Sequence, residues 1–181
     1  MSSSKGMMDT DLNSLDLPPF PPMDWDDCDW WVGEISLSFG SSVGLNVTPF
    51  DPTKSRLPST AQSDALAFQL NNGQRVFAAV LDALWAYYQR IRPRYIDYLG
   101  SDVDQLMPAL DNPEALMRLI DLRQVHVHPS EKSGIAHVGL QFGCTWDIEH
   151  GLGVMMHNDR VVELGGAEVS FAWTPTEADN M

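Results

Sequence analysis

The C-terminal third of the chain constrains the fold most, because short strand-like runs follow one another there with only turn residues between them. Runs rich in Val, Ile and Met that are separated by Gly, Asn and Asp are typical of consecutive antiparallel strands. An alternating run at residues 122–128 comes just before this region and predicts a further strand. The pattern therefore predicts an antiparallel meander of four to five strands, with the C-terminal strands at residues 135–146, 152–157, 160–164 and 168–173.

A second β region is expected nearer the N-terminus. Residues 31–47 alternate between apolar and polar side chains, and Gly40 and Ser41 interrupt the alternation. Alternation with period two places one set of side chains on a single face, and a Gly–Ser pair suits a turn. The segment predicts an N-terminal β-hairpin.

Helical signals fill the centre of the chain. Ser59 and Gln62 match a capping box, and residues 71–73 interrupt the helix that begins there. Residues 76–88 then carry apolar side chains with helical spacing along one wide face. We expect this helix to end between Arg90 and Arg92, because proline at position 93 disfavours helical geometry in the residue before it. Helices grouped between two β regions predict an α+β fold in which the helical region packs on one face of an antiparallel sheet.

The two ends of the chain differ from its centre. Residues 1–30 contain four prolines, seven aspartates and one lysine, a composition typical of a flexible arm. Residues 31–174 are expected to form a single α+β domain, and residues 175–181 a frayed tail. The sequence thus predicts one folded unit with an acidic, proline-rich extension.

Charge and composition limit the classes of partner and compartment. The formal net charge is -14 and the calculated pI is 4.4, which opposes nucleic-acid binding because counterion release needs clustered Lys and Arg. A basic protein partner fits this charge better. Two cysteines are too few for a disulfide framework, and no apolar run approaches the length of a membrane span. We therefore expect a cytoplasmic protein that does not associate with membranes, and no pattern indicates an oligomeric state.

The segment Cys144–Val154 reads C-T-W-D-I-E-H-G-L-G-V. It resembles an uncharacterised bacterial family, a domain of unknown function marked by a C-x-W-D-x-E-H-G-L-G-V signature. The similarity extends upstream to residues 58–88 and 31–33 and covers about 150 residues, without either end of the chain. Some members of that family resemble immunity-type proteins encoded near toxins, so the resemblance implies a protein-binding role.

The signature has an architectural and a chemical interpretation. In the first, Asp147 accepts backbone hydrogen bonds in a turn while Glu149 and His150 decorate the loop. In the second, these three side chains project toward His126 and His128, which share a strand face because they lie two residues apart. That arrangement would assemble a binding site or an acid/base pair.

No metal site or cofactor is assigned from the sequence. The spacing H-E-x-x-H is absent, and every pairing of the histidines as ligands depends on strand register. Cys144 lies within an apolar run and is expected to be an inert core residue rather than a nucleophile. The catalytic candidates are thus limited to Asp147, Glu149 and His150.

Two functions remain open at this point. The first is a non-enzymatic acidic module that binds a protein partner, with the immunity-like role that the resemblance implies. The alternative is a small metal-dependent or acid/base hydrolase that uses the turn with Asp147, Glu149 and His150. The acidic surface and the lack of a catalytic pattern favour the binding module.

Overall fold

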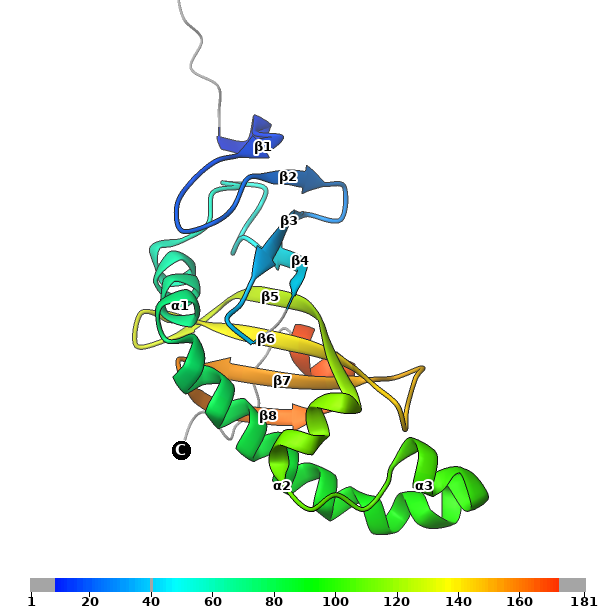
Figure 1. Ribbon diagram of the computed structural model, residues 1–181. Coiled ribbons are helices and arrows are strands. Elements are labelled where there is room, and N and C mark those ends of the chain that lie inside the picture. Colours follow the sequence, from blue (N-terminus) through cyan, green and yellow to red (C-terminus); the bar gives the residue numbers. More distant parts are fainter. Residues whose placement is uncertain (1–8, 40, 173–181) are drawn as a thin grey trace, which may run out of the picture.

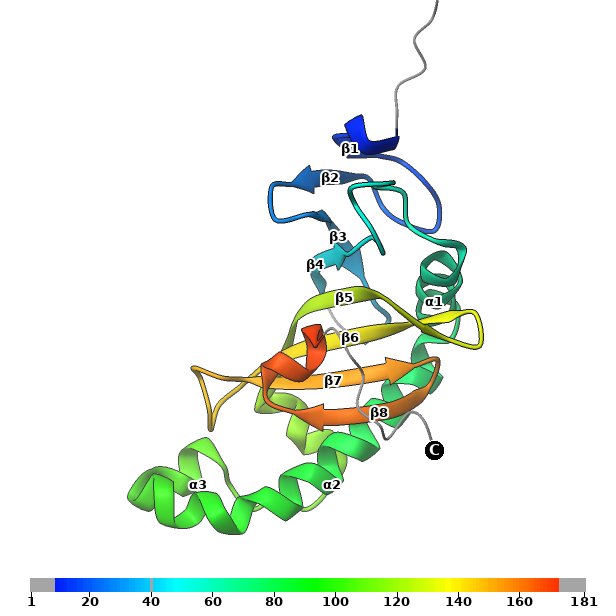
Figure 2. The same cartoon turned by 180° about the vertical axis from the view of Figure 1, so that it is seen from behind.

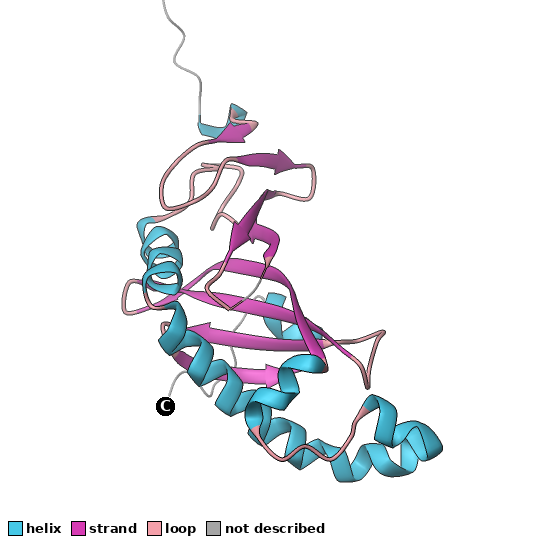
Figure 3. Ribbon diagram, in the orientation of Figure 1, coloured by secondary structure: helices cyan, strands magenta, loops and turns pink. Residues whose placement is uncertain are grey.

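The computed structural model describes residues 9–39 and 41–172 of the chain. Their strands form one eight-stranded sheet in which spatial order follows sequence order (Figures 1 and 3). Neighbouring strands are antiparallel, except that β4 and β5 are parallel. The strands are β1 (Ser14–Leu15), β2 (Met23–Asp26), β3 (Trp30–Ser36), β4 (Ser42–Val47), β5 (Ile120–Lys132), β6 (Ile135–Cys144), β7 (Leu152–His157) and β8 (Arg160–Gly165).

The helices enter between β4 and β5, and this insertion explains the one parallel pair. A parallel neighbour needs a crossover connection, and the helical segment supplies it. The crossover comprises α1 (Thr60–Asn71), α2 (Gly73–Leu99), η2 (Gly100–Asp102), α3 (Val103–Leu106) and η3 (Pro113–Arg118). Figure 1 shows α1 and α2 on one face of the sheet, α1 over β5 and β6 and α2 running past β8. The predicted α+β fold, N-terminal hairpin, helical layer and C-terminal meander are confirmed.

The core lies between this helical layer and the sheet. In β5, Val125 and Val127 are fully or almost fully buried, and their partners across the sheet, Leu140 and Val138 in β6, are buried as well. Apolar burial of this kind stabilises the fold by about 25 cal/mol for each Å² removed from water. The face that carries Val125 and Val127 is therefore the core face, and the alternate residues of β5 point to the opposite face.

The predicted start and interruption of the helices are confirmed. Ser59 caps α1 with a capping box, in which its side chain accepts from the Gln62 amide and the Gln62 side chain accepts from the Ser59 amide. Gly73 begins α2 at the expected break, and a Cβ there would collide with the side chain of Ser38.

The predicted end of the long helix is wrong, because α2 continues through Pro93 to Leu99. A proline inside a helix removes one backbone hydrogen bond and costs about 3 kcal/mol. Contacts with the returning chain oppose this cost: Arg92 Nε donates to the Met107 carbonyl at 2.9 Å, and the Tyr88 hydroxyl donates to the Pro108 carbonyl at 2.6 Å. This part of α2 is thus stabilised by residues 107 and 108, which follow the helix in the sequence.

The predicted strand at residues 168–173 is also wrong. Residues Ala167–Phe171 form the short 3-10 helix η4, which lies on the face of the sheet opposite α1 and α2 (Figure 2). Gly139 and Gly153 leave two positions on this face without side chains, and a Cβ on Gly139 would collide with the Ser170 carbonyl. The helix therefore settles directly on the sheet backbone, while Trp173 lies outside the described residues.

The prediction of a flexible arm fails for residues 9–30. This segment contributes β1 and β2 to the sheet, and Leu15, Phe20 and Met23 are buried. Arg56 holds the segment through two contacts. Its guanidinium lies 4.4 Å from the ring centroid of Trp25, and its Nη1 donates to the Leu12 carbonyl at 2.7 Å. The buried apolar side chains between the prolines therefore anchor this N-terminal segment to the sheet. Residues 1–8 of the predicted arm and the predicted tail at residues 175–181 lie outside the described residues.

Candidate functional site

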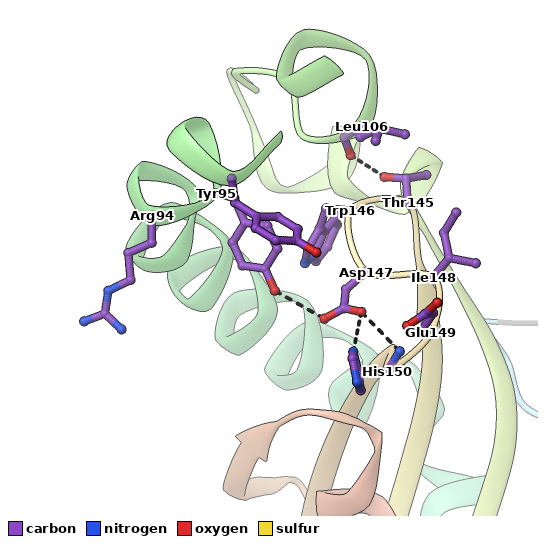
Figure 4. A pocket seen from close by; sticks show the side chains of 10 residues that line it. Arg94, Tyr95, Leu106, Thr145, Trp146, Asp147, Ile148, Glu149 and His150 are labelled. Carbon is purple, nitrogen blue, oxygen red and sulfur yellow. Dashed lines mark hydrogen bonds and ion pairs between the residues drawn. The ribbon is translucent and has the colours of Figure 1, made fainter. Parts of the chain in front are cut away.

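A groove of about 570 Å³ opens at the end of the sheet where β6 runs into the signature turn (Figure 4). One wall comes from the part of α2 that follows Pro93, and the other from the turn itself. We call it the α2–turn groove; it is lined by Arg94, Tyr95, Tyr98 and Leu106 on the helical side and by residues 145–150 of the turn.

Two contacts hold the turn against the helical layer, and a third closes the turn itself. The Thr145 hydroxyl donates to the Leu106 carbonyl at 2.5 Å. The Trp146 ring is buried and meets the ring of Tyr88 edge-on, with 5.1 Å between the centroids. Gly151 has a positive φ of 62°, which glycine adopts without steric cost, and its amide closes the turn by donating to the Asp147 carbonyl at 2.9 Å. The signature thus forms a turn fixed to the helical layer.

Asp147 is the centre of the polar contacts in the groove. One carboxylate oxygen, Oδ1, accepts from the His150 amide at 3.1 Å and lies 2.8 Å from His150 Nδ1. The other, Oδ2, accepts from the Tyr95 hydroxyl at 3.3 Å (Figure 4). Asp147 therefore links the turn to the helix.

The carboxylate also changes the proton affinity of its neighbours. The hydrogen bond and the charge of Asp147 raise the pKa of His150, whose side chain is 72% exposed. Burial, with a further contribution from Asp147, raises the pKa of Tyr95 to about 12. Because Nδ1 faces Asp147, Nε2 is the nitrogen through which His150 can exchange a proton with a ligand.

Apolar side chains are exposed at the edge of the groove. Tyr98 is 81% exposed and Ile148 is 72% exposed, although both are large and apolar enough to favour burial. Glu149 is exposed beside them and adds a negative charge. The groove thus combines an apolar rim with charged and hydrogen-bonding groups.

The sequence-predicted candidates divide between two places. Asp147, Glu149 and His150 line the α2–turn groove together. His126 and His128 line a different cavity, which has no lining residue in common with the groove. Within residues 9–39 and 41–172 there is no group of three or more His, Cys, Asp or Glu side chains placed to hold a metal ion. The convergence considered for all five residues is therefore not seen.

Sequence reasoning missed the helical wall of the groove. Arg94, Tyr95 and Tyr98 follow Pro93, where the helix was expected to have ended. A signal was present, because Ile91, Tyr95 and Leu99 continue the spacing of three and four residues that begins at Tyr88. The helical spacing of these apolar residues indicated the observed end of α2 better than the proline did.

Cys144 behaves as an interior residue. It is 5% exposed, its thiol donates to the Asp147 carbonyl at 3.4 Å, and burial raises its pKa to about 11. A thiol with this pKa is almost entirely protonated at neutral pH and is a poor nucleophile. The expected core role of Cys144 is supported by these properties.

Fold and groove together define an α+β protein with an eight-stranded sheet and an open groove between α2 and the signature turn. A family model described as a domain of unknown function, DUF6985, matches residues 20–171. The chain therefore belongs to the DUF6985 family, and the match begins inside the segment that was predicted to be an arm. No curated protein and no solved structure matches the chain. None of the helices built from the described residues has the length and apolar character needed to cross a membrane.

Proposed function

We propose that this protein is a non-enzymatic, acidic module that binds a protein partner through the α2–turn groove. The observation that carries the proposal is the exposed apolar rim, Tyr98 and Ile148, around a cavity of about 570 Å³. Exposed apolar groups beside a pocket mark interaction sites, because binding removes them from water. A side chain of the partner would enter the groove and pack between these two residues.

Charge indicates the chemistry of the partner. The chain has a net charge of -14, and the groove itself is lined by two carboxylates, Asp147 and Glu149, against one guanidinium, that of Arg94. A basic surface on the partner would be steered toward this field and would associate quickly at low salt. We therefore propose a basic partner that inserts an apolar side chain flanked by Lys or Arg. An immunity-like role, in which this chain covers and blocks a toxin, is the finer form of the same proposal.

A site-specific crosslink tests the location of the interface. A photoreactive phenylalanine replaces Tyr98 in one variant and Phe50 in the control, because Phe50 is 83% exposed and lines none of the cavities described here. The variants are expressed together with basic proteins encoded next to this gene. We expect a crosslink to one of these proteins from position 98 and none from position 50.

Affinity measurements on the captured pair then test the chemistry. Changing both Tyr98 and Ile148 to Ala should weaken binding by about tenfold or more, as loss of central apolar anchors does, whereas Phe50→Ala should leave the affinity unchanged. Binding should also weaken as salt concentration rises. Equal affinity in all variants, or a partner whose binding ignores salt, contradicts the proposal.

A second candidate function is supported by the pairing of Asp147 with His150. A carboxylate that holds Nδ1 of an exposed histidine leaves Nε2 to act as a general acid or base. An acid/base hydrolase of this type should hydrolyse activated esters with a rate that follows the protonation of His150. His150→Gln should abolish that rate and Glu149→Gln should not; equal background rates in both variants would exclude this candidate.

A further inference from the structure

We infer that the cavity formed by His126, His128, Gln141, Thr48, Trp30 and Phe171 is a second binding site, for a small uncharged planar heteroaromatic molecule. We call it the histidine pocket. It measures about 280 Å³ and lies on the face of the sheet that carries η4. It is separate from the α2–turn groove, so the inference does not rest on the proposed protein-binding function.

The histidine pocket is uncharged, although the protein as a whole is strongly acidic. Its described lining contains no Asp, Glu, Lys or Arg, while the chain carries a net charge of -14. Burial lowers the pKa of His126, and it lowers the pKa of His128 to about 4, so both rings are neutral near pH 7. A charged ligand would find no counter-charge here, and an anion would also be repelled by the overall field.

Aromatic rings supply the walls. His126 meets Phe171 edge-on, with 5.8 Å between the ring centroids, and lies 6.5 Å from the ring of His128. Trp30 contributes a further ring from β3. Flat apolar faces of this kind favour a flat ligand, which can stack or meet them edge-on. The shape of the lining therefore selects an aromatic molecule.

The backbone explains how Phe171 reaches the pocket. Gly139 of β6, the partner of His126, has no side chain, and a Cβ there would collide with the Ser170 carbonyl. The glycine therefore lets η4 lie directly on the sheet, so that Phe171 closes one side of the pocket. The histidine pocket thus depends on a glycine of β6 and on the short helix η4.

Hydrogen bonds within the protein occupy one nitrogen of each histidine ring. His126 Nε2 lies 3.3 Å from Gln141 Oε1, and His128 Nε2 lies 2.9 Å from the Ser170 carbonyl oxygen. Both oxygens are acceptors, so each Nε2 donates and each Nδ1 of the neutral rings is left as an acceptor. Gln141 and Thr48 also line the pocket, and their side chains carry an amide and a hydroxyl donor. A ligand with both N–H donors and ring or carbonyl acceptors matches this set.

Volume sets an upper limit on the ligand. A cavity of about 150 Å³ accommodates benzene, so one of about 280 Å³ suits a single ring with a substituent or two fused rings. Free purine bases and aromatic amides have this size and this donor and acceptor pattern. Their phosphorylated derivatives carry negative charge and are expected to be rejected.

The test uses adenine and nicotinamide as probes and adenosine monophosphate as the charged control. The full chain is labelled at its histidine rings and titrated with each compound up to about 10 mM, a range that detects even millimolar dissociation constants. We expect adenine or nicotinamide to cause saturable shifts of the His126 and His128 signals, and adenosine monophosphate to cause none. No saturable shift with either probe, or equal binding of the charged control, overturns the inference.

Two variants separate binding at the histidine pocket from binding elsewhere. Phe171 is 47% exposed, so Phe171→Ala should leave the unfolding temperature close to that of the parent while it weakens probe binding by about tenfold, as loss of a stacking face does. Phe50→Ala is the control of similar chemistry and should bind the probe normally. Unchanged affinity in Phe171→Ala refutes the site.

Discussion

The buried histidine His128 makes stability depend on pH in a way that can be calculated. It is 5% exposed and its Nε2 donates to the Ser170 carbonyl at 2.9 Å. Burial lowers its pKa from 6.5 to about 4, because the charged ring would lose its hydration inside the protein. The unfolded chain exposes the same ring and restores its ordinary pKa. The perturbation we consider is a change from neutral to mildly acidic pH.

The sign follows from which state binds more protons. Between the two pKa values the unfolded chain is protonated at His128 and the folded protein is not, so acid favours unfolding. The contribution of the neutral His128 ring to the free energy of unfolding is fully present above the unfolded pKa. It is lost as pH falls toward the folded pKa. From about pH 7 to about pH 5 the loss amounts to about 2 kcal/mol, from the linkage relation with these two pKa values. The lowered pKa of His126 acts in the same direction.

Urea unfolding of the parent and of His128→Gln at both pH values isolates this effect. Titration of the carboxylates is common to the two proteins and cancels in the difference, so the parent should lose about 2 kcal/mol more than the variant. His150→Gln is the matched control. Because the pKa of His150 is raised, this group adds to the free energy of unfolding below its unfolded pKa, and that contribution is lost as pH rises. Equal losses in the parent and in His128→Gln would refute the depressed pKa.

Three further predictions follow from single contacts. Gly139→Ala should destabilise the protein by about 3 kcal/mol in urea, because the added methyl collides with the Ser170 carbonyl and displaces η4; an unchanged midpoint would contradict the close approach. Asp147→Asn should lower the pKa of His150 in an NMR titration, since the carboxylate that raises it is gone, and an unaltered titration would show that the pair does not form in solution. Ser59→Ala should cost about 1 kcal/mol in thermal unfolding through loss of the helix cap.

The elements predicted correctly from the sequence are those fixed by local chemistry. The strand at residues 152–157 has both its bounds set by turn residues, and it is observed as predicted. The capping box at Ser59 needs only four residues to specify its geometry, and it too is present. In these places the information lies within a short stretch of chain.

The errors occur where distant contacts decide. Pro93 stays within α2 because Met107 and Pro108 return to accept hydrogen bonds from that helix. The segment at residues 168–173 has the composition of a strand, yet Gly139 opens a place for a 3-10 helix on the opposite face of the sheet. Neither partner lies within a local window, so propensity alone could not identify these outcomes.

The candidate site also combines features that local sequence determines with features that depend on distant contacts. Asp147, Glu149 and His150 could be grouped from the sequence because they share one turn. Tyr95 could not, because its approach to Asp147 depends on the helix passing Pro93. His126 and His128 were correctly placed two apart along one strand, but whether that strand face met the turn depended on the arrangement of the sheet.

The signature itself separates into residues that hold the turn and residues that face the groove. Cys144 and Trp146 are buried, and Gly151 adopts a positive φ, so changes at these positions act on folding. Ile148 and Glu149 are exposed and make no contribution to the core, so Ile148→Ser with Glu149→Gln should leave the unfolding temperature within a degree or two of the parent, as exposed substitutions usually do. If that double variant folds normally but no longer binds the partner, the turn serves recognition. If it both folds and binds as the parent does, the exposed half of the signature is not part of the interface, and the α2–turn groove is not the binding site.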